Sequence, residues 1–197
     1  MIFYSKHDIF EAMDKKTLAL KIDHTILKQE TTEADIIKLC REAKNYGFAS
    51  VCINPCYVKL SVDELKGSEI PVCCVIGFPL GSNCERIKIE EAKTALEDGA
   101  FELDMVLNVG KLKDKKYNEI VQEIRNIKSI MPESTILKVI IETALLTTEE
   151  KIEACKIVNQ SGADYIKTST GMNPAGGATI EDVELLTEFM DWSKCLT

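Results

Sequence analysis

Lys167 is the residue of this chain whose type and position most clearly predict covalent chemistry. It ends the apolar segment 163–166 and precedes a Thr-Ser-Thr-Gly sequence. A lysine at the end of a buried parallel strand is open to desolvation, which lowers the pKa of an ammonium group. The resulting neutral amine is a nucleophile that forms a Schiff base with a carbonyl substrate. The alternative is a lysine whose charged head simply reaches solvent from a strand end.

Five more charged residues interrupt apolar segments that read as buried strands, namely Asp23, Glu102, Asp104, Lys138 and Glu142. Asp104 lies within Glu-Leu-Asp-Met-Val and Lys138 within Leu-Lys-Val-Ile. Burying either charge without a partner costs several kcal/mol, so we expect them to converge on a polar centre. There Asp104 either relays protons or forms a plain ion pair with a lysine. His24, beside Asp23 at the end of the first apolar segment, is better explained as a structural hydrogen-bonding residue.

Three glycines follow Lys167 in a segment that could form an anion-binding loop. Gly171, Gly176 and Gly177 lie between the last apolar segment and a helix that begins after Thr179. A turn rich in glycine presents backbone N–H groups to an anion such as phosphate. The same glycines also suit ordinary turns, so this signal is weak by itself.

The composition excludes several classes of protein. The 197 residues are 45% hydrophobic and 28% charged, which predicts one soluble globular domain over residues 1–197. No apolar run reaches the length of a membrane span, and the N-terminus does not resemble a signal peptide. A net charge of −8 argues against a general nucleic-acid or membrane-surface binder.

The cysteines are interpreted as reduced core thiols of a cytosolic protein, because most of them lie in apolar runs and no secretory signal accompanies them. No paired CxxC motif is present, and the chain has only two histidines, so no metal site is expected. The eight cysteines are Cys40, Cys52, Cys56, Cys73, Cys74, Cys84, Cys155 and Cys195.

Six short apolar segments read as strands and recur at regular intervals, with helical patterns between them. The strand segments are 20–27, 49–54, 72–78, 101–109, 136–142 and 164–168. Thr32, Thr147 and Thr179 each precede an acidic residue by three positions, which is the spacing of a helix capping box. Apolar stripes predict the buried helix faces, such as Ile89, Ala92 and Leu96. A further helix is expected over 7–18, and the connection 55–67 is less regular.

Six successive βα units without a hairpin signal predict a parallel sheet covered by helices. Either an open doubly wound sheet or a (β/α)8 barrel fits this pattern. No GxGxxG or GxxxxGK[ST] motif is present, and this argues against an open sheet of the nucleotide-binding kind. Charged residues on the strands favour a barrel, whose interior near the C-terminal mouth accommodates a polar cluster.

Six motifs in fixed order carry a resemblance to the deoxyribose-phosphate aldolase family, over about residues 17–189. They are Ile-Asp-His-Thr from 22, Val-Cys-Ile-Asn-Pro from 51, Ile-Gly-Phe-Pro-Leu-Gly from 76, Glu-Leu-Asp-Met-Val from 102, Leu-Lys-Val-Ile-Ile-Glu-Thr from 137 and Lys-Thr-Ser-Thr-Gly from 167. This resemblance implies a (β/α)8-type barrel and a class I aldolase, a lyase that uses neither metal nor cofactor.

The resemblance also implies a role for individual residues. The Schiff-base lysine and the proton-relay acid would be Lys167 and Asp104. Asp23 and Lys138 would support the network of charges. Cys52 and Thr170 would lie near the substrate, and Gly171 would contribute to the phosphate site. The implied reaction is reversible cleavage of 2-deoxy-D-ribose 5-phosphate to D-glyceraldehyde 3-phosphate and acetaldehyde. Such an enzyme would act in cytoplasmic deoxyribonucleotide and carbohydrate catabolism, as a possible homodimer, on a small sugar phosphate.

The family pattern continues past the last helix predicted here. It includes a seventh strand with a second active-site lysine and an eighth strand with a phosphate loop, so about six βα units of the barrel are expected in this sequence. An incomplete gene product, completion by a second chain and an inactive relative are the alternatives that follow. Other Schiff-base lyases on this barrel, and an interaction protein that uses open strand edges, also remain as hypotheses.

Overall fold

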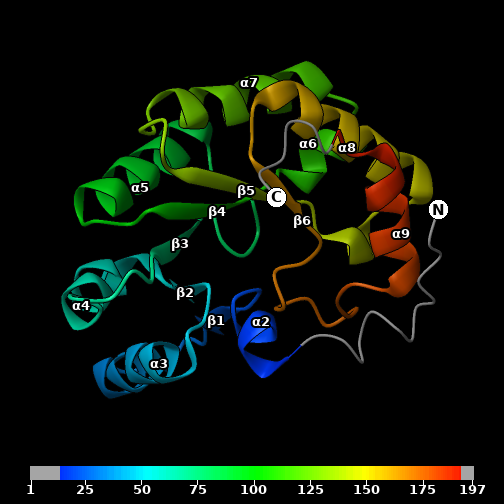
Figure 1. Ribbon diagram of the computed structural model, residues 1–197. Coiled ribbons are helices and arrows are strands. Elements are labelled where there is room, and N and C mark those ends of the chain that lie inside the picture. Colours follow the sequence, from blue (N-terminus) through cyan, green and yellow to red (C-terminus); the bar gives the residue numbers. More distant parts are fainter. Residues whose placement is uncertain (1–13, 192–197) are drawn as a thin grey trace. The chain divides into compact units, whose positions relative to one another are not determined.

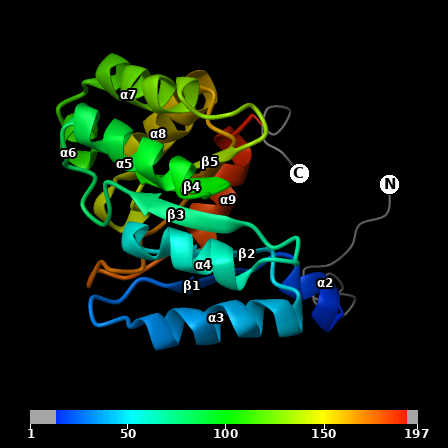
Figure 2. The same cartoon turned by 90° about the vertical axis from the view of Figure 1, so that its left-hand side faces the viewer.

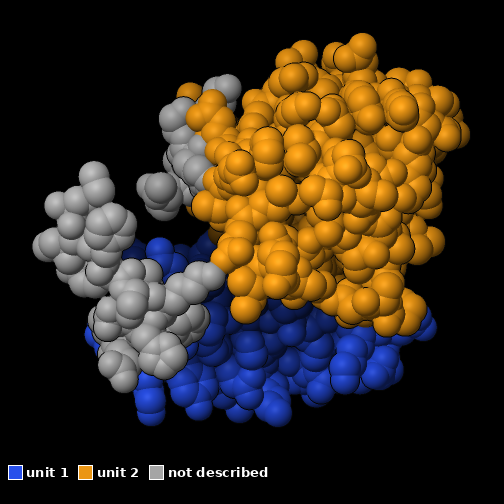
Figure 3. Space-filling view, turned by 90° about the vertical axis from the view of Figure 1, so that its right-hand side faces the viewer, with its two compact units in different colours: residues 1–73 blue, residues 74–197 orange. Residues whose placement is uncertain are grey.

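The computed structural model describes residues 14–191, and the chain forms two compact units, residues 1–73 and 74–197 (Figure 3). Six strands form one sheet in the order β1-β2-β3-β4-β5-β6 (Figure 1). Their bounds are β1 Asp23–Ile26, β2 Ser50–Ile53, β3 Val72–Ile76, β4 Glu102–Val106, β5 Ile136–Ile140 and β6 Tyr165–Lys167. Each lies inside a predicted segment. Strand order that follows chain order, without a reversal, is that of a barrel rather than of a doubly wound sheet.

The first unit places two helices beside a pair of parallel strands. β1 and β2 pair with His24 opposite Val51. Helices α3 (Glu33–Tyr46) and α4 (Val58–Glu64) lie side by side, as Figure 2 shows. The irregular connection after β2 proves to be the short turn η1 (Pro55–Tyr57) followed by α4.

Helix α3 begins and ends where the sequence predicts. The hydroxyl of Thr32 accepts a hydrogen bond from the backbone N–H of Asp35, and the Asp35 carboxylate accepts one from the N–H of Thr32. Gly47 ends the helix in the left-handed conformation that favours glycine. Of the helix expected over 7–18, residues 7–13 lie outside the described residues, and α2 spans Lys15–Ala19.

The second unit covers β4–β6 with a row of neighbouring helices, in which α5 contacts α7, α7 contacts α8 and α8 contacts α9 (Figure 1). The bounds are α5 Glu85–Glu97, α6 Val109–Lys113, α7 Tyr117–Ser129, η2 Thr143–Leu145, α8 Thr148–Ser161 and α9 Ile180–Phe189. Capping boxes open α8 and α9 as predicted. Within residues 14–191, no helix combines the length and apolar character needed to cross a membrane.

One local prediction about this unit is confirmed only in part, and another is wrong. Ala92 of the predicted stripe on α5 is buried, whereas Ile89 and Leu96 are only half-buried, and the buried face also includes Lys88. The predicted strand 101–109 ends at Val106, because the side chain of Asn108 accepts a hydrogen bond from Lys111 N–H and caps helix α6. A capping side chain competes with strand extension, and apolar periodicity does not register this competition.

The cysteines divide into two groups. Cys40, Cys52, Cys73, Cys74 and Cys155 are buried, whereas Cys56 and Cys84 are exposed, and all seven are free thiols. The interpretation as core thiols is thus confirmed for the five buried residues and wrong for the two exposed ones. Cys195 lies outside the described residues.

This division predicts selective alkylation of the native protein. Burial raises the pKa of the Cys155 thiol to about 11, so little reactive thiolate forms there at mildly alkaline pH. Iodoacetamide should therefore label Cys56 and Cys84 and spare Cys155, as judged by peptide mass spectrometry. Denatured protein, in which every thiol should react, is the control. If native Cys155 were labelled as fast as Cys84, the buried position of Cys155 in helix α8 would be contradicted.

Candidate active site

Strand register in the second unit brings the predicted charged residues onto one face of the sheet. β4 and β5 are parallel with Asp104 opposite Lys138, and β5 and β6 are parallel with Ile140 opposite Lys167. Residues opposite one another in register share a face, and so do residues two apart along a strand. Glu102 therefore joins Asp104, Lys138 and Lys167 on the same face.

These four side chains form a chain of alternating charges. The Lys167 ammonium contacts Asp104 Oδ2, and the Lys138 ammonium lies 3.3 Å from Asp104 Oδ1. Lys138 also donates a hydrogen bond to Glu102 Oε2. The Asp104 side chain is fully buried, and those of Lys138 and Glu102 are 10% exposed. Two ammonium groups and two carboxylates cancel in charge, and this makes their burial tolerable.

Lys167 is the accessible end of this chain, because its side chain is 31% exposed. Its amine needs to lose a proton before it can attack a carbonyl carbon, and Asp104 is the carboxylate in contact with it. Lys138 places a second cation on the same carboxylate, where it competes with Lys167 for the negative charge. The arrangement can therefore support an amine nucleophile with a proton acceptor beside it.

Thr170 and Gly171 lie in the loop that follows β6, and this loop is fastened to Glu142. The Thr170 hydroxyl donates to Glu142 Oε2 at 2.5 Å, and the Thr170 N–H donates to Oε1 at 3.3 Å. The N–H of Met172 in turn donates to the Thr170 hydroxyl at 3.1 Å. Gly171 has φ +75°, which favours glycine. One buried carboxylate thus holds the Thr170 part of this loop, while Thr168 O, at the start of the loop, accepts a hydrogen bond from Thr143 N–H at 2.8 Å.

Glu142 itself has a left-handed backbone, with φ 55° and ψ 66°. For a residue other than glycine this conformation costs about 1–3 kcal/mol, and it tends to persist at functional sites. Glu142 was recognised in the sequence only as an acid on a predicted strand. The available signal was an acidic residue that ends a buried strand segment, two positions beyond Ile140.

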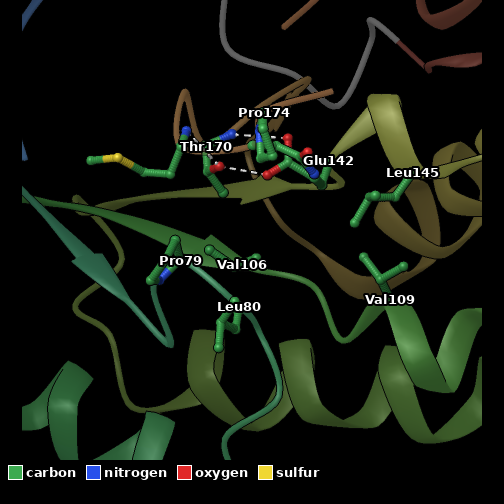
Figure 4. A pocket seen from close by; sticks show the side chains of 10 residues that line it. Pro79, Leu80, Val106, Val109, Glu142, Leu145, Thr170 and Pro174 are labelled. Carbon is green, nitrogen blue, oxygen red and sulfur yellow. Dashed lines mark hydrogen bonds between the residues drawn. The ribbon is translucent and has the colours of Figure 1, made fainter. Parts of the chain in front are cut away.

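A cavity of ≈ 190 Å³ opens beyond the ends of these strands (Figure 4). Val106 and Glu142 line it. Val106 is opposite Ile140, which is opposite Lys167, and Glu142 follows Ile140 by two residues. Most of the other lining residues are apolar. They are Pro79, Leu80, Val109, Leu145, Thr170, Met172, Asn173 and Pro174.

Asp23, Cys52 and His24 belong to the first unit. The Asp23 carboxylate accepts a hydrogen bond from Ser50 at 2.8 Å, and Cys52 is buried in β2. Their implied supporting and substrate-contact roles stay predictions. His24 contacts Glu42 at 2.9 Å and packs its ring against Phe48, which confirms the structural interpretation of this histidine.

In the described part of the second unit, residues 74–191, no three histidine, cysteine or acidic ligands lie close enough together to hold a metal ion. The amine of Lys167 and the carboxylate of Asp104 are in contact at the accessible end of the charged chain.

Comparison with known proteins agrees with this arrangement. Residues 17–194 match the model of the DeoC/LacD family aldolases. The chain is 53% identical over 176 residues to a deoxyribose-phosphate aldolase of Clostridium perfringens, which covers 89% of this chain and 78% of the relative. It is also 53% identical to one of Clostridium tetani, over 85% of this chain and 77% of the relative.

A solved structure gives the same result for the fold. The tetrameric deoxyribose phosphate aldolase of Aeropyrum pernix is 31% identical, with a TM-score of 0.82 over 98% of this chain and 82% of that one. The β/α-barrel type of fold is thereby confirmed, with six strands in residues 14–191. Together with the family match over most of the sequence, these relatives show that the chain belongs to the DeoC/LacD family of aldolases.

Proposed function

We propose that Lys167 of this chain forms the Schiff base through which a deoxyribose-phosphate aldolase cleaves 2-deoxy-D-ribose 5-phosphate. The observation that carries the proposal is the accessible Lys167 ammonium at the outer end of a buried chain of alternating charges. The products are D-glyceraldehyde 3-phosphate and acetaldehyde, and the reaction is reversible. Relatives at 53% identity bear the name of this enzyme, which supports the assignment of substrate.

The steps follow from the chemistry of an amine beside a carboxylate. Neutral Lys167 attacks C1 of the open-chain sugar, and loss of water leaves a protonated imine. A base then takes the proton of the C3 hydroxyl, and the C2–C3 bond breaks with its electron pair moving toward the imine. Glyceraldehyde 3-phosphate leaves, and an enamine of two carbons remains on Lys167. Protonation at C2 and addition of water release acetaldehyde and restore the amine.

Asp104 is proposed to exchange protons in these steps, because its carboxylate contacts Lys167. Lys138 and Glu102 are proposed to hold that carboxylate in place and to balance its charge. Gly171 is proposed to offer its backbone N–H to the substrate phosphate, and Thr170 to shape the same loop through Glu142.

The decisive test is reductive trapping with the wild-type chain. Incubation with acetaldehyde and borohydride should place an ethyl group on Lys167, and release of glyceraldehyde 3-phosphate from the sugar should be measurable by a coupled assay. Folded protein that gives neither an adduct nor product would overturn the proposal. Trapping with sugar phosphates of other chain lengths tests whether a different Schiff-base lyase is present.

A homodimer in the cytoplasm is proposed as the working form. The seven free thiols in the described residues support a reducing compartment. Light scattering measures the oligomeric state, and a mass equal to one chain would contradict the dimer.

Loss of the Glu142 carboxylate should slow this reaction. We expect Glu142→Gly to relieve the left-handed backbone yet lower kcat by about tenfold, because two hydrogen bonds to a charged acceptor hold the Thr170 loop. The coupled assay measures the change. Thr170→Ser, which keeps the hydroxyl, is the matched control and should retain most activity. A Glu142→Gly variant with wild-type turnover would show that the loop needs no such tie.

A further inference from the structure

A second buried ion pair lies outside the proposed active site. Lys88 of α5 and Glu123 of α7 are both fully buried, and Lys88 Nζ lies 3.0 Å from Glu123 Oε2. Burial lowers the pKa of the Lys88 ammonium, and the Glu123 carboxylate opposes that shift. A buried ion pair of this kind generally stabilises a fold no better than apolar residues of similar volume. Stability alone therefore does not explain why a lysine occupies this position.

The same ammonium also holds the end of a strand. Lys88 Nζ donates a hydrogen bond of 3.0 Å to the carbonyl oxygen of Val106, the last residue of β4. Val106 lies two residues beyond Asp104, and it is opposite Ile140 in register. The amide of the next residue, Leu107, donates to the carbonyl oxygen of Ile140 at 2.9 Å. Lys88 thus fastens the strand end that carries the proton-exchanging carboxylate.

The aliphatic part of Lys88 supports the loop that follows β3. A Cβ at Gly77 would lie only 2.8 Å from Lys88 Cε, so glycine is needed for this close approach. Gly77 O accepts a hydrogen bond from Gly81 N–H at 2.7 Å. Gly81 in turn lies against the Leu107 carbonyl, where a Cβ would collide. The loop 77–81 and the end of β4 therefore both pack against the side chain of Lys88.

Both supported segments form walls of the cavity in Figure 4. Pro79 and Leu80 come from the loop, and Val106 comes from the end of β4. A shift of either segment changes the shape of this cavity, and a shift of the end of β4 also changes the direction of Asp104, which lies two residues before Val106 on the same strand. A misplacement of about 1 Å at a distance from the chemistry can cost roughly 100-fold in rate.

We infer that Lys88 is a positioning residue of the aldolase reaction, which holds the end of β4 and the loop 77–81 in the geometry that the site requires. The inference rests on the proposed function. Glu123 has a different part, because its carboxylate contacts Lys88 Nζ and compensates the buried positive charge. Lys88 and Glu123 should therefore separate in their effects on turnover and on stability.

Two variants test this separation. Lys88→Met/Glu123→Leu replaces the pair by apolar residues, so we expect a melting temperature near that of the wild type and a kcat lowered roughly 10- to 100-fold. Glu123→Gln keeps the Lys88–Val106 hydrogen bond, so we expect a lower melting temperature and near-wild-type kcat at a temperature where the variant is folded. A purely structural pair would leave the kcat of both folded variants near that of the wild type, so the kcat of Lys88→Met/Glu123→Leu decides between the two interpretations.

The matched control is another ion pair of α7, between Lys128 and Asp164 at the other end of the strands. Lys128→Met/Asp164→Asn should leave kcat unchanged. A folded Lys88→Met/Glu123→Leu variant with wild-type kcat would overturn the inference, and so would an equal loss in the control.

A measurement that is independent of activity separates this inference from the proposed function. Amide hydrogen exchange at Gly81 and Leu107 should be about tenfold faster in Lys88→Met/Glu123→Leu than in the wild type, with exchange in α8 unchanged. Unchanged exchange at these amides would refute the positioning role even if the wild type proved inactive. An inactive, untrapped wild type would refute only the proposed function.

Discussion

Replacing Lys167 by methionine is expected to lower kcat by at least about 10⁴-fold, because it removes the amine that we propose carries every covalent intermediate. Methionine keeps a long unbranched side chain, so the space near the end of β6 stays filled. The same substitution should abolish the ethyl adduct formed with acetaldehyde and borohydride. The coupled assay and peptide mass spectrometry measure the two effects on the same preparation.

Lys113→Met is the control for this substitution. Lys113 is a half-exposed lysine of α6 that pairs with Glu150 at the surface, and its loss should change neither turnover nor trapping. Circular dichroism should show both variants folded. Substantial turnover by Lys167→Met, or an ethyl group on a different lysine of the wild type, would assign the nucleophile elsewhere.

Asp104→Asn is expected to lower kcat by roughly 10²- to 10⁴-fold, the usual contribution of a general acid or base. The amide keeps the size of the carboxylate but cannot take up a proton from the amine or the substrate. Lys167 retains its amine, so trapping of acetaldehyde should persist at a reduced rate. Turnover and trapping thus separate proton transfer from nucleophilic attack.

Removing Asp104 also leaves the ammonium groups of Lys138 and Lys167 without the carboxylate they share. A lower melting temperature is therefore expected, since loss of one partner of a buried ion pair is destabilising. Asp164→Asn, which alters a carboxylate paired with Lys128, controls for this effect and should leave kcat unchanged. Equal kcat in Asp104→Asn and the wild type would exclude a role in proton exchange.

The alternating order of charges explains how two lysines and two acids are held together on one face of a folded sheet. Glu102 binds Lys138, Lys138 contacts Asp104, and Asp104 contacts Lys167. The side chain of Lys167 is 31% exposed, whereas those of Asp104, Lys138 and Glu102 are at most 10% exposed, so the buried charges are held by one another and Lys167 is the accessible member. Lys138 and Lys167 thus place two cations on the same carboxylate.

Much of the fold was predictable because its signals are local. Thr32 and Gly47 bound helix α3 as expected, since a capping box and a left-handed glycine depend on a few neighbouring residues. The six strands lie within predicted segments because a strand of a parallel sheet that is covered on both faces consists mainly of β-branched and other apolar residues. The end of β4 was placed too late, since Asn108 caps a helix that the apolar pattern did not reveal.

The sequence by itself determined the order of the βα units, the helix caps and the identity of Lys167, Asp104 and Lys138 as the charged residues of buried strands. Only the tertiary structure decided that register aligns these three with Glu102, and that Glu142 holds the loop of Thr170. It also decided that Lys88 and Glu123 are buried together. The physical reason is that a charged residue is predicted to face solvent unless its partner is known. Each of these partners lies on a different strand or helix, brought near only by the packed fold.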